Sequence, residues 1–487
     1  MIVLPFLMRT IILYQLGEQY LGLNSLFSSI LQVLNLSELG FSSAIVYSLY
    51  KPIAENDTEG ICALMAYYRK TYRKIGCFIG VVGLILAPFV PYLIKGDCPE
   101  AVNVYVLYLI YLGNTVISYL CFAYKSALLT AHQRVDVISN IGTITQGGLV
   151  LLQSILLLVT HNYYLYIIMM PVFTILNNIL ISYQVKRLYP DYAGRGELEK
   201  DKIRQIQKQV YGLMINKICV VSRNSFDSIV ISAALGLTAT AIYSNYYYIM
   251  TSILGIMTVI CDGMLGGIGN SLVVESREKN YQDLKKINFP YMWLGGWCTI
   301  CLACLYQPFM RLWAGPTRMF DNMTVLLFCL YFYVLKMGDV RGLYSDAAGL
   351  WWNNRIRAIC EAICNLTLNL ILVHIWGVAG VVAATLISLL VINFGFGSQI
   401  VFHHYFRNGK LGEYFLLHGK YALVTALVGC VTYSICGLVP GQGLLTLVAK
   451  GVICCVIPNV LYVGIYCRTE EFKVSIPWIL GILKKRR

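Results

Sequence analysis

The chain has 487 residues, of which 58% are hydrophobic and only 13% are charged. A soluble domain carries about 25% charged residues, so this composition excludes a large soluble protein, which would have too few polar side chains to cover its surface. The net charge of +14 would suggest nucleic acid in a soluble protein, but in a membrane protein the placement of basic residues matters more. We therefore expect a polytopic membrane protein that does not bind nucleic acid.

Apolar stretches long enough to cross about 30 Å of hydrocarbon predict about fourteen membrane-spanning helices. Their approximate limits are 1–16, 22–50, 75–95, 101–125, 137–160, 163–185, 209–235, 238–265, 290–312, 323–348, 356–376, 378–402, 414–437 and 443–466. The first span is short and has neither a basic leading region nor a cleavage site. We interpret it as a truncated helix 1 rather than a signal peptide.

The orientation follows from the basic residues, because Lys and Arg collect in cytoplasmic loops. Alternate connections and the C-terminal tail are rich in both residue types, while the opposite loops carry little beyond Lys95 and Arg318. Both termini are therefore predicted to be cytoplasmic.

The longest polar interruption, 186–208, predicts a cytoplasmic linker between two lobes. We expect an N-terminal lobe at 1–185, a C-terminal lobe at 209–402, and a last pair of helices with a basic tail at 403–487. Weak internal similarity supports this division, since the segment 11–17 resembles 230–236 and the segment 127–134 resembles 348–355. The offsets of 219 and 221 residues predict two pseudo-symmetric six-helix bundles.

Ionisable residues at mid-membrane cost about 2.5–3.5 kcal/mol each if they face lipid, so several in one chain are expected to face an interior. Asn216, Arg223 and Asp227 recur at i, i+7 and i+11, which places them on one stripe of a helix. The other candidates within predicted spans are Lys125, Lys217, Asp262, Lys336, Asp339 and Glu361. We interpret the set as lining a water-filled cavity between the two halves.

Any one of these residues could instead form an interhelical pair or extend to a nearby interface. Lys125, Lys336 and Asp346 lie close enough to the ends of predicted helices to do so. For Arg223 and Asp227, which are the deepest pair, the pattern favours a cavity role. Basic groups suit a diphosphate or an acidic sugar, and buried carboxylates suit coupling to H⁺ or Na⁺.

Other patterns argue against a cofactor or an enzyme. The spacing Cys298-x-x-Cys301-x-x-Cys304 resembles that of a ferredoxin, but it lies in an apolar span without a fourth ligand nearby, so we interpret it as packing and expect no metal. The chain lacks a Gly-x-x-x-x-Gly-Lys-Ser/Thr loop, which excludes direct use of ATP. The outer loops are too short for a catalytic domain, so we expect no enzyme and no cofactor.

Two regions of the sequence resemble a known family. The first comprises the segments 21–27, 36–44 and 50–54, and the second comprises 227–232, 235–237 and 243–246. These segments resemble bacterial polysaccharide-biosynthesis flippases of the multidrug/oligosaccharidyl-lipid/polysaccharide exporter superfamily. The resemblance implies an all-α MATE-like fold, in which two six-helix bundles form a V around a cationic cavity. By position it also assigns cavity roles to Glu38 and Asp227, and to Arg9 on helix 1. Spans 13 and 14 exceed the twelve-helix minimum, as in superfamily members that move lipid-linked substrates.

The resulting hypothesis is a flippase for polyprenyl-diphosphate-linked oligosaccharides in the bacterial cytoplasmic membrane, working by alternating access without ATP hydrolysis. Arg223, with Arg9 and either Lys217 or Lys125, would attract the diphosphate, and Glu38 or Asp227 would balance charge or couple H⁺ or Na⁺. Expected partners are membrane lipid, a polysaccharide polymerase and glycosyltransferases. The alternatives are a cation-coupled multidrug exporter of the same fold and a noncatalytic scaffold of polysaccharide assembly.

Overall fold

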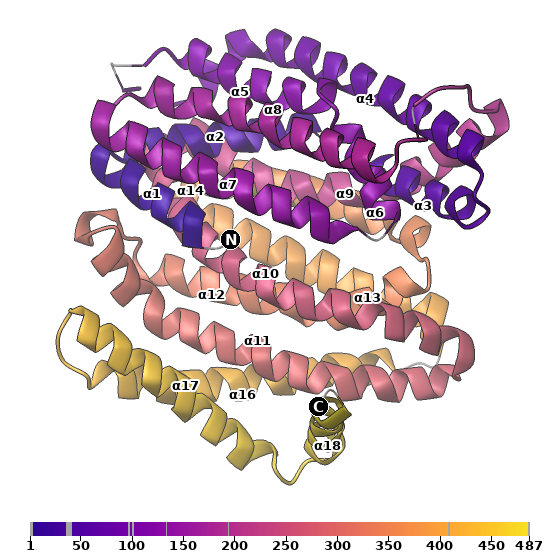
Figure 1. The fold of residues 1–487 in the computed structure, drawn as a ribbon. Helices are drawn as coiled ribbons and strands as arrows, with labels where there is room; N and C mark the ends of the chain where they lie inside the picture. Colours follow the sequence, from indigo (N-terminus) through magenta and orange to yellow (C-terminus); the bar gives the residue numbers. More distant parts are fainter. Residues whose placement is uncertain are drawn as a thin grey trace. The chain divides into compact units, whose positions relative to one another are not determined.

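The computed structural model describes residues 3–35, 41–95, 98–99, 102–132, 134–192, 194–407 and 410–485. Within these ranges every regular element is a helix, and long helices run side by side in each part of the molecule (Figure 1). The chain forms two compact units, residues 1–241 and 242–487. The all-α expectation is confirmed.

Besides α9 (Lys200–Leu235), the first unit contains seven α-helices of nine residues or more among the described residues, joined by shorter elements. They are α1 (Val3–Gln15), α2 (Glu18–Leu34), α3 (Phe41–Ala54), α4 (Thr58–Leu86), α5 (Val104–Leu120), α7 (Val135–Thr160) and α8 (Tyr163–Leu188), with η2 (Ala87–Leu93), η3 (Ala123–Lys125) and α6 (Ser126–Ala131) between them. Asn103 and Asn162 begin α5 and α8, because each side-chain oxygen accepts hydrogen bonds from the free backbone N–H groups of the first turn. Helix α5 packs against α4 and α8, and α8 packs in turn against α7.

Helix α9 (Lys200–Leu235) begins inside the segment 186–208, which we expected to be a linker. It packs against α2 in the first unit, where the Ser225 hydroxyl donates to Gln32 Oε1 at 3.1 Å. The boundary between the compact units falls within the next helix, α10 (Leu237–Val274). The lobe limits at 185 and 209 remain a prediction.

The second unit is organised around one long helix, α11 (Arg277–Trp313), which packs most extensively against four others. These are α12 (Asn322–Met337), α16 (Leu411–Gly437), α17 (Leu444–Tyr466) and α18 (Glu470–Lys485); the unit also contains η4 (Pro316–Arg318), α13 (Asp339–Ala347), α14 (Trp351–Ser388), η5 (Leu389–Phe396), α15 (Gly397–Val401) and η6 (Phe402–Phe406). Asp321 begins α12, because its carboxylate accepts from the N–H groups of Met323 and Thr324 and from the Thr324 hydroxyl. These bonds hold the pKa of Asp321 below its usual value.

Helix α14 is broken at Gly377, where we expected the boundary between spans 356–376 and 378–402. The residue has φ 58° and ψ −132°, a conformation that favours glycine because it has no Cβ. Farther along, the segment η5 winds as a π-helix, a wider turn that leaves some backbone carbonyls free for side chains.

Nine helices of the described residues are long and apolar enough to cross a membrane, and ten if α5 and the η3–α6 segment, bent by 47°, form one broken span. The protein is therefore a multi-pass membrane protein. As described, α1, α2 and α3 are each shorter than 18 residues, and the apolar part of α9 that falls within the described residues is Ser225–Leu235, so the count of fourteen stays a prediction. Helices α4 and α11 begin at Thr58 and Arg277, well before residues 75 and 290, where we expected the corresponding membrane spans to start. A helix can continue through polar residues beyond the hydrocarbon.

Helix α11 approaches its neighbours closely at Gly296. A Cβ at this position would lie 2.6 Å from Tyr462 Oη and 2.7 Å from Thr425 Oγ1. On either side of it, Trp293 Nε1 donates to Asn459 Oδ1 and Trp297 Nε1 donates to the Cys454 carbonyl, both at 2.8 Å. The α11 surface is thus fitted to α16 and α17 by both shape and hydrogen bonds.

Gly296→Ala is expected to destabilise the protein by about 1–3 kcal/mol, because the added methyl group has no space between the three helices. Thermal unfolding of the purified protein, followed by tryptophan fluorescence, measures the effect. Gly419→Ala on α16 is the matched control, since a Cβ there meets nothing within 4 Å. An unchanged unfolding temperature for Gly296→Ala would show that α16 and α17 are not held tightly on α11.

Candidate functional site

A group of buried charged residues lies in the second unit. Lys336 on α12 is only 4% exposed, and its Nζ lies 2.5 Å from Asp339 Oδ2. The same carboxylate oxygen accepts a hydrogen bond from the Tyr291 hydroxyl on α11. Its place near a predicted helix end had suggested that Lys336 could extend to a membrane interface. The ion pair with Asp339 shows instead that Lys336 points into the protein. Its charge is neutralised inside the protein, as buried charges require.

Glu361 on α14 forms the second pair in this group. Its Oε2 atom accepts from Arg357 Nη1 at 2.6 Å and from Asn393 Nδ2 at 2.9 Å. Asn393 lies in the π-helical segment η5, and its backbone carbonyl accepts from Arg341 Nη1 at 2.8 Å. The widened turn of η5 thus joins two arginines and one glutamate from α13 and α14.

Arg341 is a residue that the sequence analysis missed. It lies on α13 with 6% exposure, and electrostatic interactions link it to Asp339, Arg357 and Glu361. It brings Lys336, Asp339 and Glu361, three of the predicted candidates, into one network. Asp346 also interacts electrostatically with Arg341 and Arg357, so three cations in this network are balanced by three carboxylates. Its position inside the predicted span 323–348, two residues after Asp339, was the signal that could have revealed it.

The predicted stripe on α9 is described in part. Arg223 and Asp227 are 5% and 1% exposed, and both have interaction partners. They lie four residues apart and so share one face of α9, while Ser225, two residues from each, lies on the opposite side. The side chains of Asn216, Lys217 and Asp262 lie outside the description, as does the whole of Glu38.

The two remaining basic candidates belong to the first unit. Lys125 donates to Ser182 Oγ at 2.7 Å and lies over the Phe122 ring at 5.3 Å from its centroid, so it bridges η3 and α8. Arg9 on α1 is half-buried and interacts electrostatically with Tyr166 on α8. Neither contact depends on Arg223 or Asp227, and both residues connect helices of their own unit.

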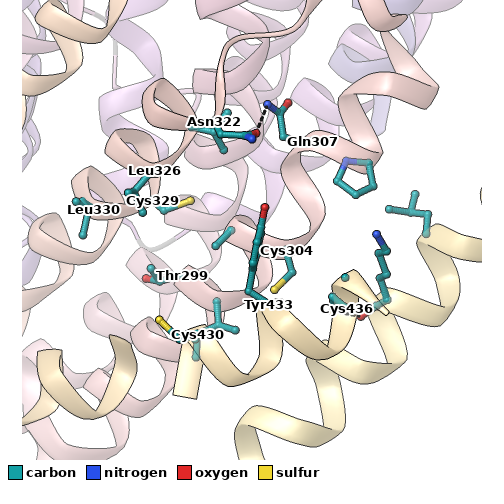
Figure 2. Close-up of a pocket in the computed structure, with 18 of the residues that line it drawn as sticks. Thr299, Cys304, Gln307, Asn322, Leu326, Cys329, Leu330, Cys430, Tyr433 and Cys436 are labelled. Atoms are coloured by element: carbon teal, nitrogen blue, oxygen red, sulfur yellow. Dashed lines mark hydrogen bonds between the residues drawn. The ribbon is translucent and has the colours of Figure 1, made fainter. Parts of the chain in front are cut away.

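The second unit also contains a cavity of about 660 Å³ between α11, α12, α16 and α17. Apolar side chains form most of its lining. Gln307 and Asn322 are joined there by a hydrogen bond of 3.2 Å (Figure 2). Arg311 and Lys450 add two positive charges to the lining. This chemistry suits an amphiphilic molecule with an apolar body and an anionic group. The sequence analysis did not anticipate a cavity here.

These features define a multi-pass all-α membrane protein with buried charges in each unit. No family model and no curated protein matched the sequence. Several solved structures share its fold. An inward-facing multidrug-resistance transporter of the MATE family, in the MOP superfamily, has a TM-score of 0.69 at 13% identity, with 84% of this chain and 96% of that chain covered.

The lipid II flippase MurJ in an inward closed conformation has a TM-score of 0.65 at 14% identity, with 95% of this chain and 98% of that chain covered. A MOP-superfamily transporter from Pyrococcus furiosus has a TM-score of 0.55 at 13% identity, with 81% and 91% covered. The chain thus has the fold shared by MATE transporters and MurJ, and these neighbours are transporters and a flippase rather than enzymes.

Proposed function

We propose that this protein is a flippase that moves polyprenyl-diphosphate-linked oligosaccharides across the bacterial cytoplasmic membrane, by alternating access and without ATP hydrolysis. Both termini face the cytoplasm in this proposal. The polyprenyl tail stays in lipid while the charged and sugar-bearing part passes through the protein.

The observation that carries the choice of substrate is the extent of the shared fold. Residues 411–487, which contain α16, α17 and α18, make up 77 of the 487 residues. The match with the lipid II flippase covers 95% of the chain and therefore includes most of this segment, while the match with the multidrug transporter covers 84%. The additional helices favour a lipid-linked substrate over a soluble drug.

A buried arginine, Arg223, supports an anionic substrate. A diphosphate binds most strongly to arginine, whose planar guanidinium donates two parallel hydrogen bonds. In the proposal Arg223 attracts the diphosphate together with Arg9 and either Lys217 or Lys125. Glu38 or Asp227 balances the charge or couples the movement to H⁺ or Na⁺.

A multidrug exporter is the second candidate, favoured by the TM-score of 0.69 with a MATE transporter. Such a protein would carry soluble cations and would place acidic and aromatic groups around them. The cavity of the second unit, whose lining carries Arg311 and Lys450 and no acidic side chain among the described residues, favours an anion instead.

Depletion of this protein in its own host is expected to stop export of polyprenyl-linked oligosaccharide, and re-expression of the chain is expected to restore it. The measurement is the amount of lipid-linked oligosaccharide accessible at the outer face of the membrane, with drug susceptibility followed in the same cells. Unchanged export combined with increased sensitivity to cationic drugs would favour the exporter. No change in either would favour the noncatalytic scaffold.

A further inference from the structure

Three cysteine thiols from three helices converge at the edge of the cavity in the second unit. They belong to Cys304 on α11, Cys436 on α16 and Cys454 on α17, and all three residues are buried. Their sulfur atoms all lie within 4.8 Å of one another. Because the residues are far apart in the sequence, this meeting depends on the packing of α11, α16 and α17 and not on local spacing.

The separation of the sulfurs matches that of ligands around one metal ion. Cys436 Sγ and Cys454 Sγ lie 3.9 Å apart. With metal–sulfur bonds of about 2.3 Å, two ligand sulfurs lie about 3.8 Å apart in a tetrahedral site and about 4.0 Å apart in a trigonal one. The thiols are therefore arranged so that small side-chain rotations would complete three such bonds.

The surroundings can supply charge balance and access. Lys450 on α17 acts electrostatically on both Cys436 and Cys454, so a cation already offsets part of the charge of three thiolates. Cys304 and Cys436 line the cavity, which gives an ion a path to them (Figure 2). A fourth sulfur is close by, because Cys301 lies one helical turn before Cys304 and its Sγ is 3.9 Å from the Cys454 carbonyl oxygen.

We propose that Cys304, Cys436 and Cys454 form a binding site for a thiophilic d¹⁰ cation, Cu⁺ or Zn²⁺. Each thiol loses its proton to solvent and forms one metal–sulfur bond, so binding releases three protons and involves no change of oxidation state. Thiolates select such soft or borderline cations over Mg²⁺ and Ca²⁺. The bound ion would join α16 and α17 to α11, and this role is independent of what the protein transports.

Two other interpretations make different predictions. Buried cysteines often serve as small apolar side chains, which is how we interpreted Cys304 from its sequence pattern alone; such thiols would bind no stoichiometric metal. Alternatively, Cys436 and Cys454 could form a disulfide, which requires their sulfurs to approach to about 2.05 Å and leaves too few thiols for the ion.

The test uses the full chain, purified in detergent with reductant and freed of metal by a chelator. It is titrated separately with Zn²⁺, Cu⁺ and the spectroscopic probe Cd²⁺. We expect one ion per chain to remain after gel filtration, a thiolate-to-Cd²⁺ charge-transfer absorption, and X-ray absorption that shows three sulfur neighbours at about 2.3 Å from Zn²⁺ or Cu⁺. In the Zn²⁺ sample, an additional oxygen or nitrogen neighbour would indicate a four-coordinate site. In the Cu⁺ sample, the absence of such a neighbour would indicate a three-coordinate site.

Two triple variants test the assignment of the ligands. Cys304→Ser/Cys436→Ser/Cys454→Ser is expected to lose the bound ion, while Cys360→Ser/Cys455→Ser/Cys467→Ser, which removes three exposed cysteines, is expected to retain it. Absence of stoichiometric binding by the wild-type chain would overturn the proposal, as would equal loss in both variants. Recovery of a Cys436–Cys454 disulfide from metal-free protein would overturn it too. The wild-type spectra decide the question even if the first variant fails to fold.

Discussion

Arg223→Ala is expected to reduce export of lipid-linked oligosaccharide roughly tenfold to a hundredfold at a matched level of protein. In the proposed mechanism the guanidinium donates charge-assisted hydrogen bonds to the diphosphate, each worth about 1.5–3 kcal/mol. Losing one such bond lowers a binding constant about tenfold for every 1.4 kcal/mol. The measurement is the outer-face oligosaccharide in depleted cells that express the variant, with the amount of membrane-inserted protein determined in parallel.

The same helix provides the control for Arg223. Arg204 also lies on α9, but its side chain is 82% exposed and its carboxylate partner, Asp201, is exposed as well, so Arg204→Ala is expected to leave export unchanged. Arg223→Lys should retain part of the activity, because a lysine keeps the charge but loses the planar pair of donors. Full export by Arg223→Ala would remove this residue from the proposed substrate contacts.

Glu361→Ala is expected to produce a large loss of stability. The substitution leaves Arg357 without its partner at 2.6 Å and takes an acceptor from Asn393, which holds Arg341. Removing one partner of a buried ion pair costs about 3–5 kcal/mol, because the remaining charge is left uncompensated. Thermal unfolding of the purified protein, followed by tryptophan fluorescence, should show a clearly lower transition temperature.

Glu413 provides the comparison for Glu361. Its side chain is 49% exposed and pairs with Lys285 at 3.0 Å, so Glu413→Ala is expected to cost no more than about 1 kcal/mol. Glu361→Gln distinguishes a role in stability from a role in coupling export to H⁺ or Na⁺. The glutamine keeps the shape of the side chain and a hydrogen-bond acceptor but removes the charge. Normal stability of Glu361→Gln together with lost export would favour the ion-coupling role predicted from the sequence over a structural one.

Much of the helical pattern could be predicted because hydropathy reports directly on burial in lipid. The spans expected at 137–160 and 163–185 correspond to α7 and α8, and the break expected after residue 376 falls at Gly377. Helices α4, α9 and α11 begin earlier in the chain than the spans expected from hydropathy. Hydropathy marks where a helix enters lipid, while the helix itself continues as far as its backbone hydrogen bonds allow.

The sites were harder to predict, because their residues meet only through tertiary packing. The analysis of single helices identified Lys336, Asp339 and Glu361 as polar residues in apolar spans. It could not show that Asn393 and Arg341 connect two of the ion pairs across α13, α14 and η5. For the same reason the sequence did not reveal the surroundings of Cys304, because its neighbours Cys436 and Cys454 come from helices more than 130 residues farther along the chain.

The fitted surface of α11 has a consequence for how this architecture can change during evolution. Trp293 and Trp297 donate their indole N–H groups to α17, and Gly296 allows its close approach. A descendant that lost residues 411–487 would expose two unsatisfied N–H groups and a groove to hydrocarbon, where unpaired polar groups are costly. Helices α16, α17 and α18 therefore cannot be lost by truncation alone, because their loss requires coordinated substitutions along α11. Their gain requires the opposite substitutions on α11.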